Sequence, residues 1–216
     1  MAYDHIAWDF NGTILDDAAV SMEITNRLLR ERALPEVGSL DEHFRRFCFP
    51  VEEYYVALGF DFSCESYASV AAEWMAEYRM RTPTIPLCSG AAELIAAFFH
   101  AGIGQSVLSA SEAGILRAQL AAHGLLPYFE EVSGREDVRA QSKTDAVLAW
   151  RDRRRPGRVL MIGDNLHDAL CAQAAGFDCA LVCSNAVGRQ RLQDAGCPVF
   201  SSCFELMAAL KEEGSL

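Results

Sequence analysis

The stretch His5–Gly12, which reads HIAWDFNG, decides the fold of this 216-residue chain. The run His5–Phe10 is mostly apolar and short, which predicts a buried strand, and Asn11 with Gly12 predicts the turn that ends it. A helical pattern follows directly. A strand that meets a turn and then a helix is typical of the opening of an α/β fold.

The segment after this turn has a helical character over about seventy residues. Asp16 or Asp17 is a candidate cap for a first helix that ends near Pro35 and Gly38. The expected helices are Asp16–Ala33, Leu40–Cys48, Val51–Leu58 and Glu65–Arg81. Pro83 and Pro86 close the segment, so we expect a helical insertion after the first strand.

Strands and helices alternate in the rest of the chain. The expected strands are Gln105–Leu108, Arg158–Ile162 and Cys179–Cys183, and the expected helices are Gly90–His100, Glu112–His123, Ser142–Arg153 and Leu166–Ala175. Such alternation predicts parallel strands joined by helical crossovers. The sequence therefore predicts an α/β protein with a Rossmann-like core domain, residues 1–15 and 84–216, and a helical cap domain, residues 16–83.

Composition limits the partners of the chain. The formal net charge is -11, and such an acidic surface repels a phosphate backbone, so we expect no nucleic-acid partner. The basic cluster Arg151–Arg158 is better explained as a solvated turn. No run approaches the ~20 apolar residues of a membrane span, and the N-terminus shows no secretory signal, so no membrane partner is expected. The eight cysteines form no CxxC pair, which favours reduced thiols and a cytoplasmic protein.

Several polar residues are expected at the carboxyl ends of the strands, where open α/β sheets bind their ligands. Asp9, Ser109 and Asp164 each end a predicted strand, and Asp168 lies one helical turn beyond Asp164. Carboxylates at Asp9 and Asp164 are the oxygen ligands that magnesium prefers. Lys143 begins a predicted helix, from which its charge can reach a phosphate.

These segments together resemble the four motifs of the haloacid dehalogenase superfamily. Asp9–Thr13 resembles the first motif, normally DxDGT, and Ser109 resembles the second. Lys143 resembles the third, and Gly163–Asp168 matches the fourth, GDxxxD. The stretch Trp8–Asp17 also resembles the phosphoglycolate-phosphatase-like branch. The resemblance implies a phosphatase that acts on a small phosphorylated metabolite.

The resemblance also implies a metal site and a nucleophile. Asp9 would attack phosphorus and form a phosphoryl-aspartate. Its carboxylate, the backbone carbonyl of Asn11, and Asp164 would hold Mg²⁺, while Asp168 would support the metal shell or Lys143. A structural alternative exists for each acid, since Asp9 can cap a turn and the two later aspartates can complement a helix dipole.

The remaining family residues would bind the phosphoryl group. Ser109, with Ala110 after it, and the backbone near Gly12 would contact its oxygens, and Lys143 would neutralise charge between the phosphate and Asp9. Phosphoryl transfer depends chiefly on such positioning and charge neutralisation. Ser109 alone could also cap the helix that follows it, and Lys143 could be an ordinary exposed lysine.

Asn11 departs from the family pattern. Most phosphatases of the family carry an aspartate there as a general acid and base, and an amide cannot give up a proton. Turnover would then favour leaving groups of low pKa, as in acyl, aryl or anhydride phosphates. The alternative hypothesis is a phospho-ligand-binding or regulatory protein that lost turnover. The true dehalogenases also lack the second aspartate, but they lack GDxxxD as well, so Asp164 and Asp168 favour phosphate chemistry.

Substrate choice in this family resides in the cap. The candidate residues are Arg45, Arg46, Phe47, Phe49, Tyr54 and Tyr55. The aromatic side chains are expected mainly in the cap core. The two arginines fit a second anionic group on the substrate and a solvated helix face equally well. The sequence names neither the substrate nor the oligomeric state.

Overall fold

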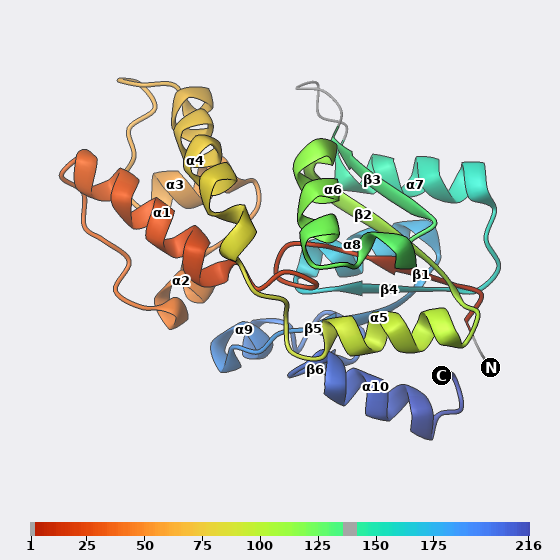
Figure 1. Cartoon of the computed structure of the whole chain (residues 1–216). Helices are drawn as coiled ribbons and strands as arrows, with labels where there is room; N and C mark the ends of the chain where they lie inside the picture. Colours follow the sequence, from red (N-terminus) through yellow and green to blue (C-terminus); the bar gives the residue numbers. More distant parts are fainter. Residues whose placement is uncertain (1–2, 136–141) are drawn as a thin grey trace.

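The computed structural model describes residues 3–135 and 142–216, and Figure 1 shows its elements. In chain order they are β1 (His5–Trp8), α1 (Ala18–Glu31), α2 (Leu40–Arg46), α3 (Val51–Ala57), α4 (Tyr67–Arg81), η1 (Thr82–Thr84), α5 (Ala91–His100), β2 (Gly104–Glu112), α6 (Ala113–Ala122), η2 (Leu126–Tyr128), β3 (Glu131–Arg135), α7 (Lys143–Arg154), β4 (Val159–Gly163), α8 (Leu166–Ala175), β5 (Asp178–Val182), α9 (Ala186–Arg191), β6 (Val199–Phe200) and α10 (Cys203–Glu212).

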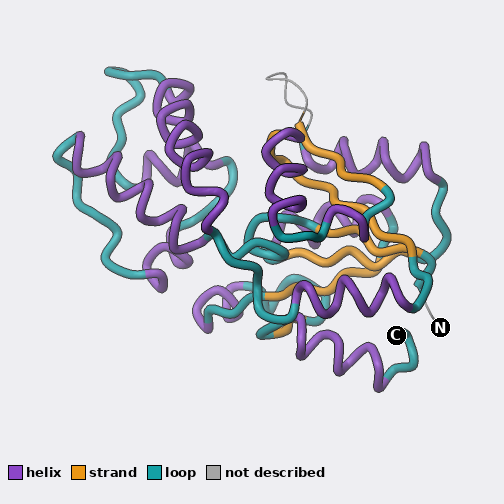
Figure 2. Tube along the Cα trace, viewed as in Figure 1, coloured by secondary structure: helices purple, strands orange, loops and turns teal. Residues whose placement is uncertain are grey.

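The strands form one parallel sheet in the order β3-β2-β1-β4-β5-β6. Figure 2 shows helices on both sides of it. This confirms the predicted α/β fold with a parallel sheet. The chain adds β2 and β3 on one side of β1 and then returns to add β4 on the other. This reversal creates a switch point between β1 and β4, where open sheets of this kind bind ligands.

The alternation of side chains along β1 explains why it lies at the centre of the sheet. Ile6 and Trp8 face one side, in a cluster that includes α5 and α10. Ala7 faces the other side and packs with residues of α7 and α8, such as Trp150 and Cys171. Successive side chains of a strand point to opposite faces. Both faces are covered, so every residue of β1 is buried.

Helices α1 to α4 lie together beside the sheet (Figure 1), and they occupy the interval in which the sequence predicts a cap. They enclose an apolar cluster of their own, which contains Leu28, Tyr54, Tyr55 and Val70. Within the described part of the chain, no helix is long and apolar enough to cross a membrane. The division into a core domain and a cap domain remains our prediction.

The two connections between the helical group and the sheet are hydrogen-bonded to each other. Leu15, on the outgoing connection, bridges Leu87 on the returning one. The N–H of Asp16 donates to the carbonyl of Pro86 at 2.9 Å, and Cys88 donates to Ile14 at 2.8 Å. The helical group is therefore attached through a paired double connection rather than through two independent linkers.

A second contact joins the helical group to α9. The Asn185 amide donates to Asp41 at 2.8 Å, and Arg191 donates to the backbone carbonyls of Phe44 and Phe47. Helix α9 is one of the elements that the sequence did not predict, together with β3, β6 and α10. This contact therefore could not be anticipated.

Two of the expected strand ends are wrong. Ser109 does not end its strand, because β2 continues to Glu112. The pairing of β2 with β3 shifts register between Leu108 and Glu112, so the regular ladder is interrupted where Ser109 lies. Such irregularities re-aim side chains near functional sites. The strand β1 likewise ends at Trp8, two residues before the predicted end at Phe10.

The contact between Trp8 and Gln105 yields a test of the core. The Trp8 indole donates to Gln105 Oε1 at 3.0 Å, and Gln105 Nε2 donates to the Ile95 carbonyl at 2.9 Å, all of them buried. We expect Gln105→Leu to lower the free energy of unfolding by about 2 kcal/mol, because two buried groups lose their partners. Urea denaturation measures the loss. In the double variant with Trp8→Phe the cost should be less than the sum of the single costs, and strict additivity would contradict the coupling.

Candidate active site

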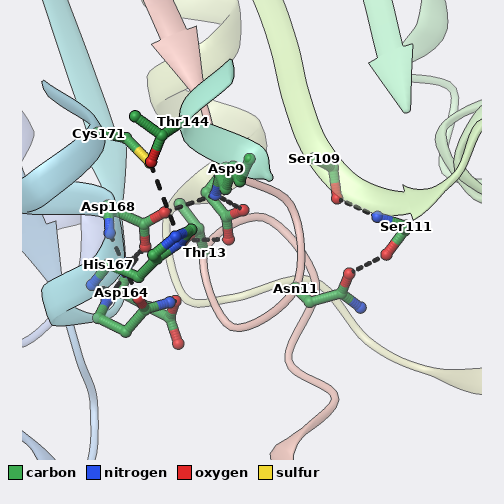
Figure 3. A network of polar contacts seen from close by, with 12 residues as sticks. Asp9, Asn11, Thr13, Ser109, Ser111, Thr144, Asp164, His167, Asp168 and Cys171 are labelled. Carbon is green, nitrogen blue, oxygen red and sulfur yellow. Dashed lines mark hydrogen bonds and ion pairs between the residues drawn. The ribbon is translucent and has the colours of Figure 1, made fainter. Parts of the chain in front are cut away.

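Three carboxylates meet at the carboxyl edge of the sheet. Asp9 follows β1, Asp164 follows β4, and Asp168 lies in the first turn of α8; one oxygen from each lies within 4.8 Å of the others. Figure 3 shows them converging from these elements. Strands β1 and β4 are paired side by side, Trp8 opposite Ile162. The sheet therefore brings together aspartates that are more than 150 residues apart in sequence.

Lys143 bridges two of these acids. It is the first residue of α7, whose start is fixed by a capping box between Ser142 and Asp145. Its ammonium donates to Asp9 Oδ1 and, at 2.5 Å, to Asp168 Oδ1, with only 6% of the side chain exposed. Burial lowers the pKa of Lys143, but the negative charges of Asp168 and Asp9 outweigh this effect and raise that pKa above its ordinary value. The lysine is therefore a fixed positive charge.

Asp168 is held on several sides. Its Oδ2 accepts the backbone N–H of Asp164 at 3.1 Å and that of Asn165 at 3.2 Å, while Oδ1 accepts Lys143. It also forms the capping box of α8 with Asn165, and its burial is complete. These bonds suit a residue that supports the loop and the lysine. Asp164 differs, because its Oδ1 accepts the Asn165 amide while its Oδ2 faces Gly12.

The backbone of Gly12 approaches Asp164 closely. A β-carbon at this position would lie 2.1 Å from Asp164 Oδ2, which is too close for any side chain. The residue also has a φ of +79°, a backbone conformation that favours glycine. The sequence predicted that Gly12 lets the backbone approach a phosphate. In the structure the group that lies against Gly12 is the Asp164 carboxylate, and the contact with a phosphate remains our prediction. Gly163 plays a similar part, since a β-carbon there would lie 2.4 Å from Asp168.

The site carries an excess of negative charge. Burial raises the pKa of Asp9 to about 6, even though the contact with Lys143 opposes this shift. Burial also raises the pKa of Asp164 well above its ordinary value, and the neighbouring charges of Asp168 and Asp9 add to the shift. Three carboxylates face one ammonium, so a divalent cation with a preference for oxygen would complement the site. The donor set therefore fits a magnesium-like ion.

Thr13 is a site residue whose role the sequence did not reveal. Its hydroxyl donates to Asp9 Oδ2 at 3.3 Å, so both oxygens of the Asp9 carboxylate are held, one by Lys143 and one by Thr13. Thr13 is fully buried. The sequence showed that Thr13 belongs to the first motif, but it did not show where the side chain points. That direction depends on the turn after Phe10, in which the Phe10 carbonyl accepts three backbone N–H groups.

The second motif lies on the other side of Asp9. Ser109 is 9% exposed, and its hydroxyl accepts the N–H of Ser111 at 3.1 Å. Figure 3 shows Ser109 and Ser111 near Asn11, on the opposite side from the cluster of acids in that view. Ala110, between the two serines, is exposed. A phosphoryl group bound by Ser109 and the backbone at Ala110 remains our prediction.

Asn11 belongs to a network that the sequence did not predict. Its amide nitrogen donates to Asp17 at 2.7 Å and to Tyr78 of α4 at 2.8 Å, and its oxygen accepts the Ser111 hydroxyl at 2.6 Å. Asp17 precedes α1 as expected, but its side chain makes no capping bond, because it accepts from Asn11 and Tyr78 instead. Burial raises the pKa of Asp17, and the bonds from Tyr78 and Asn11 oppose this.

The aromatic cap candidates divide into two kinds. Tyr54 and Tyr55 are buried in the apolar cluster of the helical group, as expected. Phe49 is 51% exposed, and its ring centroid lies 5.6 Å from that of His167 on α8. His167 follows Asp164 closely in the chain, so Phe49 places the helical group beside the acids. Arg46 pairs with Glu42 on its own helix.

Similarity to known proteins agrees with this geometry. A sequence model of the haloacid dehalogenase-like hydrolases matches residues 6–182, so the chain belongs to the haloacid dehalogenase-like hydrolase family. This confirms the resemblance seen in the four motifs. The match extends from β1 to the end of β5 and includes all the acids of the site.

One relative resembles this chain in sequence, and two solved structures resemble it in fold. A phosphoglycolate phosphatase from Photobacterium profundum is 32% identical over 92 residues, 41% of this chain. The chain covers only 40% of the length of that relative. A haloacid dehalogenase-like hydrolase from Streptococcus pneumoniae has the same fold, with a TM-score of 0.81, 13% identity, and coverage of 96% of this chain and 98% of the other. CbbY from Rhodobacter sphaeroides in complex with phosphate also has this fold, with a TM-score of 0.73, 18% identity, and coverage of 97% of this chain and 99% of the other.

The buried acids make stability depend on pH. Between the ordinary value of 3.8 and about 6, native Asp9 holds a proton that the unfolded chain releases. The contribution of Asp9 to the free energy of unfolding is therefore complete below the ordinary pKa, and it is lost as the pH rises through the raised pKa. We expect the free energy of unfolding, measured in urea with a chelator present, to fall from about pH 4 to about pH 6. Asp9→Asn should reduce this slope, and a slope unchanged by the substitution would contradict the assignment.

Proposed function

We propose that the protein hydrolyses a small phosphorylated metabolite through a phosphoryl-aspartate at Asp9, with Mg²⁺ bound beside it. The observation that supports this most directly is the environment of Asp9. Its carboxylate is buried at the switch point of the sheet, and Lys143 and Thr13 hold its two oxygens. A nucleophile held in one orientation avoids the entropic cost of finding its target.

The proposed reaction has two steps. A carboxylate oxygen of Asp9 attacks phosphorus, and the bond from phosphorus to the leaving oxygen breaks, with the electron pair going to that oxygen. A water molecule then attacks the phosphoryl-aspartate, which releases inorganic phosphate and restores the carboxylate. Lys143 stays protonated throughout and offsets the charge that is shared between Asp9 and the phosphoryl oxygens. Ser109 and the backbone at Ala110 bind those oxygens.

The metal would be held by Asp9, Asp164 and the backbone carbonyl of Asn11. When bound, Mg²⁺ neutralises charge on the phosphoryl group and so assists its transfer. Asp168 would orient Lys143 and the loop after β4 rather than bind the ion, because its oxygens already accept two backbone N–H groups and the lysine.

The substrate is proposed to be a small metabolite, because the helical group packs against the site at two points: Phe49 lies beside His167, and Tyr78 accepts a hydrogen bond from Asn11. The phosphoglycolate phosphatase relative makes phosphoglycolate one of the compounds that a substrate panel should include. We expect the reaction to take place in the cytoplasm, since all eight cysteines are free thiols.

The nucleophile can be tested directly. We expect Asp9→Asn to remove all magnesium-dependent release of phosphate from a panel of acyl, aryl, sugar and small-acid phosphates, while the thermal unfolding curve stays cooperative. The amide of the variant cannot form the acyl phosphate bond. Retained turnover would contradict the covalent mechanism. A wild-type protein that binds vanadate with magnesium but hydrolyses no phosphate in the panel would favour the binding or regulatory alternative.

The metal assignment has its own test. Asp164→Ala should weaken Mg²⁺ binding far more than Asp168→Ala, which we expect to cost about tenfold, the lower end for residues that orient metal ligands. Calorimetric titration of the wild type and both variants with Mg²⁺ gives the affinities. Equal losses would show that Asp168, and not only Asp164, binds the ion.

A further inference from the structure

The side chain of Asn11 has no hydrogen left for a substrate. An amide nitrogen carries two hydrogens, and in the structure one goes to Asp17 Oδ2 at 2.7 Å and the other to the Tyr78 hydroxyl at 2.8 Å. Its oxygen accepts the Ser111 hydroxyl at 2.6 Å. Asn11 therefore makes all of its strong hydrogen bonds within the protein, where the family pattern would place a proton donor.

Asp17 fixes the orientation of this amide. A carboxylate accepts hydrogen bonds but does not donate them, so it must face the nitrogen of Asn11 and not the oxygen. Asp17 is 8% exposed and takes part in none of the ion pairs found in the described residues. A carboxylate buried among neutral donors is costly to maintain. That cost is consistent with a specific role for the contact with Asn11.

Tyr78 connects the same amide to the helical group. Its hydroxyl donates to Asp17 at 2.8 Å while it accepts from Asn11. The Tyr78 ring stacks on Trp74, with centroids 4.7 Å apart and planes 16° apart, and it is 3% exposed. The position of α4 therefore determines whether the second hydrogen of the Asn11 amide is occupied.

We propose that Asp17 and Tyr78 are positioning residues that hold the Asn11 amide turned toward the helical group, so that a leaving group receives no hydrogen from Asn11. The proposal rests on the phosphatase function proposed above and specifies its substrate class. The preferred substrates are phosphates whose leaving oxygen is stable as an anion: acyl, aryl or anhydride phosphates. We call Asn11, Asp17, Tyr78 and Ser111 together the amide network.

The chemistry of the first step explains this preference. When the bond from phosphorus to oxygen breaks, the electron pair stays on the leaving oxygen. An alkyl leaving group then needs a proton, and a positioned donor is typically worth ~10²–10⁴-fold in rate. An acyl or aryl oxygen can depart as the anion and take a proton later from water. With the amide network intact, Asn11 supplies neither a proton nor a hydrogen bond.

Kinetics on matched variants test the selectivity. The measured quantity is the ratio of kcat/KM for 4-nitrophenyl phosphate to that for phosphoglycolate, with Mg²⁺. Tyr78→Phe frees one amide hydrogen, and Asp17→Ala removes the acceptor that fixes the amide, so each should lower this ratio by about 2–10-fold, the worth of one hydrogen bond. Tyr55→Phe is the control, because it deletes a buried hydroxyl of the helical group that is hydrogen-bonded to Thr25. The ring of Tyr55 contacts Tyr54, Phe60 and Tyr67, which are not part of the amide network.

A spectroscopic measurement tests the amide network without turnover. The side-chain amide of Asn11 gives two proton signals in a ¹⁵N–¹H spectrum, identified by their loss in Asn11→Asp. Tyr78→Phe should shift one or both, and Tyr55→Phe should shift neither. Unmoved signals together with an unmoved kinetic ratio would overturn the proposal. If the wild type hydrolyses no phosphate at all, the proposed function and the substrate class fail, and the spectra still decide whether the amide network exists.

Discussion

The structure is organised around a concentration of buried negative charge. Asp9, Asp164 and Asp168 converge at one edge of the sheet, and Lys143 is the ammonium that faces them. Burying a carboxylate costs several kcal/mol unless it is paired or hydrogen-bonded. Lysine, backbone N–H groups and the Thr13 hydroxyl offset part of that cost. The negative charge that remains unpaired explains why the cluster suits a cation, and the cation in turn allows an anionic substrate to bind beside it.

The same charge explains the local sequence around the acids. Gly12 and Gly163 leave room for the carboxylates of Asp164 and Asp168, which a β-carbon would displace. The loop after β4 turns directly into α8, so that the backbone N–H groups of Asp164 and Asn165 donate to the Asp168 carboxylate. The first N–H groups of the helix, those of His167 and Asp168, donate to the Asn165 side chain. Positive potential at a helix start favours a carboxylate there. The motif residues are therefore linked by packing as well as by chemistry, and a change at one glycine would displace an acid.

The sequence predicted the parts of the molecule that depend on local pattern. The apolar strands around Trp8 and Ile162 and the helix Leu166–Ala175 were found because strong periodicity or a continuous apolar run marks them. The short strands β3 and β6 were missed, since β3 consists mostly of polar residues and glycine and β6 has only two residues, so neither carries a recognisable pattern. The irregularity at Ser109 was missed because pairing with β3 causes it, and no local rule encodes that partner.

The two sides of the candidate site differ in the same way. Asp9, Asp164 and Asp168 lie in short motifs, so their meeting follows from strand order once the sheet is known. The leaving-group side is assembled from contacts that span 67 and 100 residues, between Asn11 and Tyr78 and between Asn11 and Ser111. Sequence pattern does not record such contacts. The chemical meaning of asparagine at this position consequently depends on residues outside its motif: with both amide hydrogens occupied, it holds the helical group to the core, and it cannot be treated as a weakened version of an acid.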